Sequence, residues 1–243
     1  QLVQGIGQLL KKNQVTVFNA SAQFIAKERL ELTDTKGQKQ QISAPHIIVA
    51  TGARAANLAH VPVDGQHVWS YKEALVPEQL PKSLLVIGSG AIGSEFASLY
   101  QDLGCQVTLV DIAKQILPSE DIEVAKYVQK QFEQHGMTVL TEAAVQNIEI
   151  DKGQVHCHVE TATGVQTITV EKVLSAIGVQ PNTQNLGLER LGIEFEHGFI
   201  KVDPWCKTNV VGVYAIGDVA GAPCLAHKAS HEAILCVEKI AGL

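Results

Sequence analysis

The sequence predicts an α/β protein that combines parallel sheets with short antiparallel β-meanders. The first observation is the apolar run 84–87, which turns through Gly-Ser-Gly-Ala-Ile-Gly at 88–93 directly into a helical pattern. The second is an apolar run that ends in Ala-x-Gly three times, at 46–52, 172–178 and 213–217. The third is a group of alternating segments, joined by turns, before each of the first two repeats. Together they predict two related domains of the three-layer, Rossmann-like type.

The segment from residue 84 to 140 is expected to fold as a β-α-β-α-β run. The second of its two helices begins at an acid, Asp121, and stops at Gly136. The short apolar segments around the helices have the length of buried strands. In chain order we expect a strand at 84–87, a helix at 91–103, a strand at 106–111, a helix at about 121–135 and a strand at 137–140.

Two β-meanders are predicted from segments in which apolar and polar residues alternate. The first comprises 15–18, 29–33 and the residues before Pro45. The second comprises 145–150, 155–160 and 165–170, with turns at 151–153 and 163–164. Each meander leads into one of the Ala-x-Gly strands, which is expected to join a parallel sheet.

The repeated pattern indicates that one domain is inserted into another of the same type. Pro77 and Pro81 mark the start of the insertion, and the glycine-punctuated stretch 182–203 marks its end. If the first domain were built like the second, its own glycine motif would precede residue 1. Because the sequence also lacks an initial Met, we expect the central fragment of a longer protein. The expected segments are a partial domain at 1–80, the complete inserted domain at 81–200 and the return of the partial domain at 201–243.

The glycine motif has the residues that a dinucleotide-binding turn requires. Gly88 permits the tight turn, Gly90 lets the backbone approach a pyrophosphate, and Gly93 lets the helix pack on its strand. The helix N-terminus offers N–H groups and a partial positive charge to the phosphates. Asp111 ends the next strand, where its carboxylate can accept both hydroxyls of an adenine ribose and would repel a 2′-phosphate. NAD is therefore favoured over NADP, and the alternative is a glycine-rich turn that binds nothing.

Composition restricts the class of protein. The 243 residues are 46% hydrophobic and carry a formal net charge of −6, which allows a packed core but includes no basic run for nucleic acid or anionic membranes. No apolar stretch approaches the roughly 20 residues needed to cross a bilayer, and no signal-peptide pattern starts the chain. We expect a protein of the cytosol or of an organelle matrix, with no nucleic-acid and no membrane partner.

The cysteines and histidines do not predict a redox or metal centre. Five cysteines are present, and none belongs to a C-x-x-C or C-x-x-x-x-C pair. His156-Cys157-His158 has the residue types of a metal cluster, but it lies in an alternating strand and no second ligand pair follows. We interpret the two histidines as one solvated strand face rather than a zinc site, and we expect no metal.

Four motifs, spread over nearly the whole chain, carry a family resemblance. They are Ile-Ile-Val-Ala-Thr-Gly at 47–52, Gly-Ser-Gly-Ala-Ile-Gly-Ser-Glu-Phe-Ala-Ser at 88–98, Val-Tyr-Ala-Ile-Gly-Asp-Val at 213–219 and Leu-Ala-His-Lys-Ala at 225–229. The chain resembles the flavin disulfide oxidoreductases, and the last motif resembles the dihydrolipoamide dehydrogenases in particular. The resemblance implies an enzyme that passes electrons from dihydrolipoamide through a redox disulfide and FAD to NAD.

The resemblance also implies roles for individual residues. On the FAD side these are Thr51 and Gly52 near the flavin dinucleotide, Asp218 on its ribityl chain, and Leu225 and Ala226, whose backbone approaches the flavin ring. On the NAD side they are Gly88, Ser89, Gly90, Ala91 and Ile92 at the pyrophosphate with Gly93 of the same motif, Asp111 at the adenosine ribose, Val145 at the adenine, Ala176 and Gly178 toward the nicotinamide, and Glu95 near it.

Some of these residues have a purely structural alternative. Asp218 could be an ordinary turn or N-cap aspartate, although its Ala-x-Gly-Asp context favours the flavin role. Glu95 could simply complement the helix dipole. His227 receives no catalytic role, and Trp69 and Trp205 are interpreted as packing residues because neither lies in a motif.

Departures from the family limit what this chain is expected to do. The C-x-x-x-x-C pair and the C-terminal dimerisation domain with its His-Glu pair are absent, Val179-Gln180 replaces a common Gly-Arg, and Asn19 replaces a common Gly. We therefore expect no catalytic residue here, and an inactive, monomeric fragment that retains NAD binding and holds FAD weakly or not at all. The parent would be a homodimer that serves lipoamide-bearing subunits of 2-oxoacid dehydrogenase complexes. The alternatives are a non-catalytic NAD-binding module and another flavin disulfide reductase.

Overall fold

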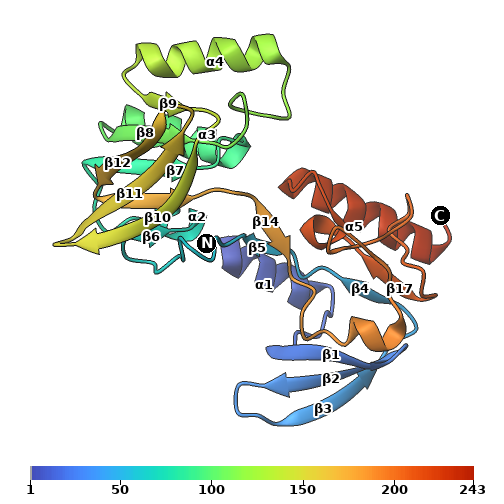
Figure 1. Cartoon of the computed structure of the whole chain (residues 1–243). Helices are drawn as coiled ribbons and strands as arrows, with labels where there is room; N and C mark the ends of the chain where they lie inside the picture. Colours follow the sequence, from blue (N-terminus) through green and yellow to red (C-terminus); the bar gives the residue numbers. More distant parts are fainter. Residues whose placement is uncertain (1) are drawn as a thin grey trace. The chain divides into compact units, whose positions relative to one another are not determined.

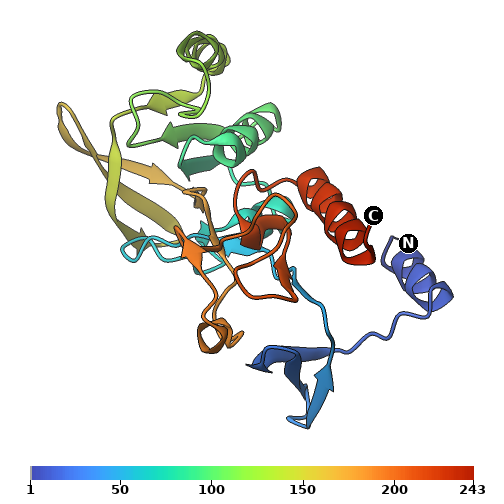
Figure 2. The same cartoon turned by 90° about the vertical axis from the view of Figure 1, so that its right-hand side faces the viewer.

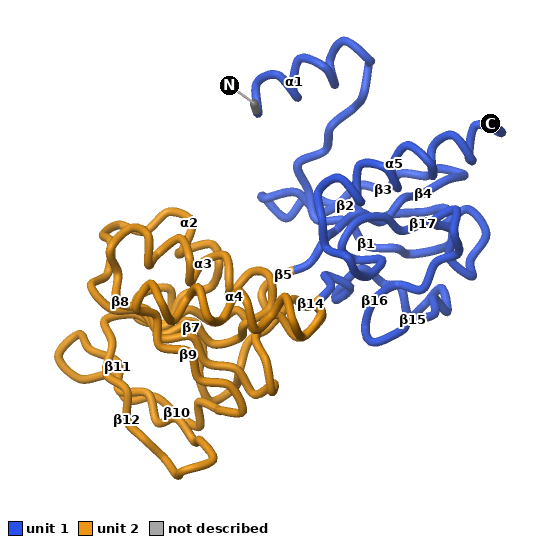
Figure 3. Tube along the Cα trace, turned by 90° about the horizontal axis from the view of Figure 1, so that it is seen from above, with its two compact units in different colours: residues 1–53, 181–243 blue, residues 54–180 orange. Residues whose placement is uncertain are grey.

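The computed structural model describes residues 2–243, which divide into two compact units (Figure 3). Unit 1 combines the described part of Gln1–Ala53 with Pro181–Leu243, and unit 2 is the continuous stretch Arg54–Gln180. Unit 2 is therefore inserted into the sequence of unit 1. Each unit contains parallel strands, helices and a three-stranded antiparallel meander. Each unit thus has the α/β composition that the sequence predicts.

Unit 2 is built on a five-stranded parallel sheet in the order β6-β13-β7-β8-β9. Helix α3 (Ala91–Asp102) connects β7 to β8, and helix α4 (Ile122–Gln134) connects β8 to β9. This is the predicted β-α-β-α-β run, in which a helical crossover lets successive strands pair in parallel. The strands of the sheet are β6 (Val68–Trp69), β7 (Ser83–Ile87), β8 (Gln106–Val110), β9 (Thr138–Leu140) and β13 (Lys172–Ser175).

The sheet of unit 2 lies between helices and a meander. Successive residues of β7 point to opposite faces: Leu84 and Val86 pack in a core with α3, whereas Leu85 and Ile87 pack in a second core with the meander. A strand that is buried on both faces is apolar at every position, which explains the continuous run at 84–87. The meander consists of the antiparallel strands β10 (Ala144–Asp151), β11 (Gln154–Thr161) and β12 (Gly164–Val170) (Figure 1).

Unit 1 repeats this plan with a smaller parallel pair, β4 (Ile47–Val49) and β17 (Val213–Ala215). Its core joins residues from both ends of the chain, among them Phe24, Val49 and Leu188. The remaining elements are α1 (Leu2–Lys12), β1 (Ala20–Ala26), β2 (Arg29–Asp34), β3 (Lys39–Ser43), η1 (Leu188–Leu191), β15 (Phe195–Glu196), β16 (Phe199–Ile200), η2 (Gly217–Ala220) and α5 (Ala226–Ala241). No helix in the described part of the chain is long and apolar enough to cross a membrane.

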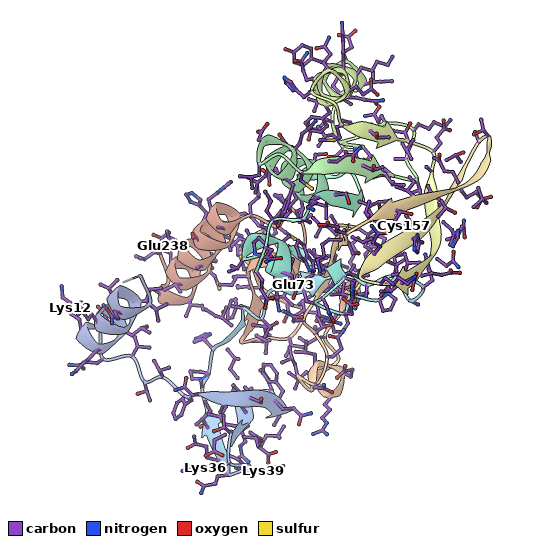
Figure 4. All side chains as sticks on the ribbon, turned by 90° about the vertical axis from the view of Figure 1, so that its left-hand side faces the viewer. Lys12, Lys36, Lys39, Glu73, Cys157 and Glu238 are labelled. Carbon is purple, nitrogen blue, oxygen red and sulfur yellow. The ribbon has the colours of Figure 1, made fainter. Side chains whose placement is uncertain are left out.

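Two short strands lie where the chain passes between the units. β5 (Ala53–Ala55) and β14 (Val179–Pro181) pair with each other in a two-stranded sheet. Helix α2 (Tyr71–Leu75) follows within unit 2 and begins with a capping box, in which the side chains of Ser70 and Glu73 bond each other's backbone N–H. Glu73 is labelled in Figure 4. The two segments in which the chain passes between the units, β5 and β14, are therefore paired with each other.

The sequence prediction was wrong for the first strand. Residues 15–18 form no strand and belong to an extended segment between α1 and β1 (Figure 2). The backbone N–H of Val15 donates to a carbonyl of α1 at 2.9 Å, so this residue completes the helix end instead of starting a ladder. Helix α1 itself was not predicted, because Gly5 and Gly7 interrupt its pattern with residues of low helix propensity.

The predicted domain boundaries also differ from those of the two units. Residues 54–80 belong to unit 2, where Val68 of β6 pairs with β13. Residues 181–200 belong to unit 1, where the N–H of Phe24 donates to the carbonyl oxygen of Leu186 at 2.7 Å. Both contacts join residues that are far apart in the sequence, and the prolines and glycines of linkers do not reveal such contacts.

Replacing Gly93 by alanine is expected to destabilise unit 2. A Cβ at residue 93 would lie 1.8 Å from the carbonyl oxygen of Gly88, so the helix would have to move. Overpacking of this kind costs about 1–3 kcal/mol or more, which urea unfolding followed by circular dichroism would measure. Gly90→Ala is the matched control, because no atom lies within 4 Å of its added Cβ. Equal losses of stability in the two variants would show that the close approach of helix and turn does not require glycine at residue 93.

Candidate functional site

The turn between β7 and α3 requires glycine at two positions because nearby backbone atoms leave no space for a Cβ. Gly88 has a φ of +98°, and an added Cβ would lie 2.5 Å from the carbonyl oxygen of Ala176. At Gly93 the added atom would collide with the carbonyl group of Gly88. Gly90 differs, because nothing lies within 4 Å of its added Cβ. Gly88 and Gly93 therefore allow the turn to pack closely against β13 and α3. The backbone at Gly90, in contrast, has free space beside it.

Helix α3 begins at this open backbone without a side-chain cap. Gly90 is the N-cap residue, and its carbonyl oxygen accepts from the N–H of Ser94 at 2.9 Å. A helix N-terminus directs its first N–H groups and a partial positive charge outward. The backbone of Ala91 and Ile92 is therefore suited to an anionic group such as a phosphate.

Asp111 directly follows β8 and is hydrogen-bonded to the glycine turn. Its Oδ2 accepts from the N–H of Ser89 at 2.6 Å and from the Ser89 hydroxyl at 2.7 Å, and its Oδ1 accepts from the N–H of Ala113 at 2.8 Å. Backbone bonds to Leu140 and Ala143, both 2.9 Å long, fix Asp111 between β9 and the start of β10. The structure thus brings together the predicted acid and the predicted glycine turn.

A surface groove with a volume of about 430 Å³ lies beside this turn. Its walls come from α3, from the loop after β8 and from α4, and they contain Ala91, Ser94, Glu95, Ser98, Leu117, Glu120, Val124 and Phe132. Leu117 has a positive φ of 47°, and its N–H donates to the carbonyl oxygen of Ser89 at 2.8 Å. The loop after β8 is thereby bonded to the turn, and the predicted residues Ala91 and Glu95 share one groove.

The remaining residues predicted on this side are placed by β10 and β13. The N–H of Ala176 donates to the carbonyl oxygen of Ile87 at 2.8 Å, and Gly178 follows with a φ of +111°. Val145 is only 5% exposed and packs in the core beneath the meander, while its carbonyl oxygen lies 3.0 Å from Nε2 of His60. No sequence signal indicated His60. Ala176 therefore joins the glycine turn, whereas the side chain of Val145 belongs to the core.

Unit 1 has its own pocket, about 360 Å³ in volume, near the ends of β4 and β17. The residues that line it are Ala50, Gly52, Ile216, Gly217, Asp218, Cys224, Ala226 and Ala229. Three residues predicted for the flavin side, Gly52, Asp218 and Ala226, thus meet in one place although they come from both ends of the chain. The other two, Thr51 and Leu225, are their neighbours in the sequence.

A lysine of α5 holds the turn that carries Asp218. Nζ of Lys228 donates to the carbonyl oxygens of Gly217 at 3.1 Å and Gly221 at 2.8 Å, on either side of Asp218. Lys228 also forms an ion pair with Glu232 at 3.0 Å, and the second carboxylate oxygen of Glu232 accepts from the N–H of Gly217 at 2.7 Å. Sequence reasoning missed this network, although the Lys-x-x-x-Glu spacing on a helix was an available signal.

All five cysteines are free, and four of them are buried. Burial raises the pKa of Cys105 and of Cys206 to about 11 and that of Cys157 to about 12, so these thiols stay protonated at neutral pH. Strand β11 places Cys157 in the core (Figure 4) and turns His156 and His158 to the other face, 2.9 and 3.1 Å from threonine hydroxyls of β12. Across residues 2–243, no three or more His, Cys, Asp or Glu side chains are grouped to hold a metal ion.

The substitution Lys228→Met is expected to destabilise unit 1. It removes the lysine donor from two backbone carbonyls and the cation from the carboxylate of Glu232, where the lysine side chain is only 16% exposed, and this costs about 1–3 kcal/mol. Lys201→Met is the control, because the ion pair of Lys201 with Glu194 is more than half exposed and should contribute less than about 1 kcal/mol. Chemical denaturation measures both losses, and a loss at Lys228 no larger than that of the control would show that the network stabilises nothing.

Comparison with known proteins agrees with the fold and the motifs. The profile of the pyridine nucleotide-disulphide oxidoreductase family matches residues 1–233. A dihydrolipoyl dehydrogenase of Zymomonas mobilis is 48% identical over 245 residues, which cover 100% of this chain and 52% of that protein. One of Rhizobium etli is 46% identical over 243 residues, which cover 100% of this chain and 50% of that protein. The chain thus spans about half the length of the curated relatives it matches.

Solved structures have the same architecture. LpdA from Mycobacterium tuberculosis matches with a TM-score of 0.90 at 29% identity, over 98% of this chain and 53% of that one. RclA, an HOCl-induced flavoprotein disulfide reductase from Escherichia coli, matches with a TM-score of 0.83 at 26% identity, over 98% of this chain and 55% of that one. These matches confirm the predicted Rossmann-like fold. Since the family profile extends over nearly its full length, the chain belongs to the pyridine nucleotide-disulphide oxidoreductase family.

Proposed function

We propose that the protein takes part in the oxidation of dihydrolipoamide by NAD⁺, and that unit 2 is the part that binds NAD. The observation that carries this proposal is the arrangement of Gly90, Ala91 and Asp111. Open backbone at a helix N-terminus suits a pyrophosphate, and a carboxylate at the end of the next strand suits a ribose. The relatives that match the whole chain at 48% and 46% identity bear the name dihydrolipoyl dehydrogenase.

In this proposal, the residues of unit 2 divide the dinucleotide between them. The N–H groups of Gly90, Ala91 and Ile92 would bind the pyrophosphate. Asp111 would accept a hydrogen bond from the adenosine ribose and, as an anion, disfavour the 2′-phosphate of NADP. The remaining proposed contacts are Gly88, Ser89 and Gly93, which shape the turn, Glu95, Ala176 and Gly178 toward the nicotinamide, and the backbone of Val145 toward the adenine.

Unit 1 is proposed to contribute to an FAD site. Its pocket joins Gly52, Asp218 and Ala226, and Lys228 holds the turn of Asp218, so that a carboxylate is positioned to accept from a ribityl hydroxyl. Thr51 and Leu225 would add backbone contacts. FAD, when bound, supplies the electron carrier between a dithiol and NAD. Because the G-x-G-x-x-G motif of this sequence lies in unit 2, unit 1 lacks a glycine turn for the FAD pyrophosphate, and the chain alone should bind FAD weakly or not at all.

The thiol chemistry of this reaction is not assigned to the cysteines of this sequence. Disulfide exchange requires an accessible thiolate and a paired cysteine, and the sequence contains no C-x-x-x-x-C pair. We propose that the whole protein is a homodimer whose partners are lipoamide-bearing subunits of 2-oxoacid dehydrogenase complexes, and that this part alone is monomeric. Bacterial cytoplasm or mitochondrial matrix is the proposed compartment, and one relative, from Pisum sativum, is named as mitochondrial.

The second candidate function is that of another flavin disulfide reductase. The match to RclA, with a TM-score of 0.83, supports this wider class, but its 26% identity is well below the 48% of the Zymomonas mobilis relative. A non-catalytic NAD-binding module would use the same turn and the same aspartate. Binding of NAD⁺ therefore tests the proposed nucleotide site in all three cases. Activity that depends on dihydrolipoamide would distinguish a dihydrolipoyl dehydrogenase from another disulfide reductase and from a non-catalytic module.

Isothermal titration calorimetry should show binding of NAD⁺ with a preference of at least about tenfold over NADP⁺. Asp111→Ala should remove most of this preference and weaken NAD⁺ binding about 10- to 100-fold, because hydrogen bonds to a charged group contribute about 1.5–3 kcal/mol. Glu123→Ala, which removes an exposed acid of α4, is the control and should change neither value. Unchanged NAD⁺ affinity in Asp111→Ala would contradict the ribose assignment.

The chain by itself is expected to produce no NADH from dihydrolipoamide and NAD⁺, because the sequence contains no redox cysteine pair. Its solutions should also be colourless, since FAD is not retained. The measurement is NADH absorbance and the visible spectrum of a sample whose mass agrees with 26.1 kDa. Turnover in such a sample would refute the first expectation, and a yellow preparation with bound flavin would refute the second.

A further inference from the structure

Ser89 directs both of its hydrogen-bond donors to one oxygen of Asp111. The N–H and the hydroxyl of Ser89 lie 2.6 and 2.7 Å from Oδ2, and the N–H of Ala113 lies 2.8 Å from Oδ1. The serine is completely buried, with 0% of its surface exposed. Three donors of the chain therefore occupy the carboxylate before any ligand arrives.

The number of acceptor positions on the carboxylate limits what it can bind in addition. An ionised carboxylate has about four such positions, two on each oxygen. The two donors of Ser89 fill both positions on Oδ2, and the N–H of Ala113 fills one on Oδ1. One position, on Oδ1, is left. A ribose whose two hydroxyls each bond a different oxygen of the carboxylate would need a position on both.

The surrounding chain keeps Ser89 next to Asp111. The carbonyl oxygen of Ser89 accepts from the Ser94 hydroxyl at 2.9 Å and from the N–H of Leu117 at 2.8 Å. On the other side, the N–H of Gly88 donates to the carbonyl oxygen of Val110 at 2.8 Å. The Ser89–Gly90 peptide group and the N–H of the preceding Gly88 are thus fixed, and the buried hydroxyl is held beside the carboxylate.

We infer that Ser89 restricts Asp111 to one hydroxyl of the adenosine ribose and thereby lowers the affinity of unit 2 for NAD. The inference rests on the proposed function, in which Asp111 receives this ribose. Ser89 acts through Asp111 and is a positioning residue: its hydroxyl takes the position on Oδ2 that the second ribose hydroxyl would use. The nucleotide is then held by the pyrophosphate and by a single ribose contact.

The wild-type chain supplies the first test, which needs no variant. NAD⁺ and its analogues that lack either the 2′- or the 3′-hydroxyl of the adenosine ribose are titrated by calorimetry. One analogue should bind within about twofold of NAD⁺ and the other at least about tenfold more weakly, because only one hydroxyl bonds the carboxylate. Tenfold losses for both analogues, or for neither, would overturn the inference.

Ser89→Ala supplies the second test. It keeps the N–H at residue 89 and removes the hydroxyl, which frees one position on Oδ2. NAD⁺ should bind about three- to tenfold more tightly, and both deoxy analogues should now bind more weakly than NAD⁺. Unchanged or weaker binding of NAD⁺ would overturn the inference. Ser89→Gly removes the same hydroxyl and gives the same comparison if the alanine variant does not fold.

Ser83→Ala is the matched control, because it removes a serine hydroxyl at the other end of β7, where this hydroxyl accepts from the N–H of Glu171 and does not contact Asp111. Its NAD⁺ affinity and its response to the two analogues should follow the wild type. Failure of the wild-type chain to bind NAD⁺ would refute the proposed function together with this inference. Binding of NAD⁺ with equal dependence on both hydroxyls would refute the inference alone.

Discussion

The close approach of helix α3 to the turn that precedes it sets the geometry of unit 2. A side chain at Gly93 would collide with the backbone of Gly88, so the helix begins where the turn is tightest. At its start, helix α3 directs its first N–H groups outward, and no atom lies within 4 Å of a Cβ added at Gly90. In the same turn, Ser89 is hydrogen-bonded to Asp111. The carboxyl ends of β7, β8 and β13 meet at the same edge of the sheet, as ligand sites of open α/β sheets require.

Both units have glycines with positive φ just after their parallel strands, but different side chains surround these glycines. Gly52, Gly178 and Gly217 each follow a parallel strand and have positive φ values of 67°, 111° and 71°. Each turns the chain at the carboxyl end of its strand, in a conformation that glycine adopts without strain. In unit 1, Lys228 and Glu232 bond the turn at Gly217. In unit 2, Ser89 and Asp111 bond each other in the turn after β7, which lies next to the turn at Gly178. The same backbone conformation therefore occurs in both units, with different side chains bonded to the turns.

Features that depend on neighbouring residues could be predicted from the sequence. The glycine turn, the run of alternating strands and helices in unit 2 and the second meander follow from local periodicity and from backbone requirements of single glycines. Features that depend on distant contacts could not. The pairing of β6 with β13 joins residues 68–69 to unit 2, and the first meander begins only at Ala20 while the N–H of Val15 bonds the end of α1. The hydrogen bonds of Ser89 and Lys228 likewise depend on how separate segments meet in space.

The reactivity of the buried cysteine thiols can be used to measure local unfolding in each unit. Cys157 lies in the core beneath the meander of unit 2, whereas Cys206 and Cys236 pack with Tyr214 in unit 1. A protonated thiol that is shielded from solvent does not attack disulfide reagents, so modification requires that the structure around it opens first. The rates at these positions are therefore separate measures of the opening free energy of an inserted domain and of its host, obtained without introducing any label.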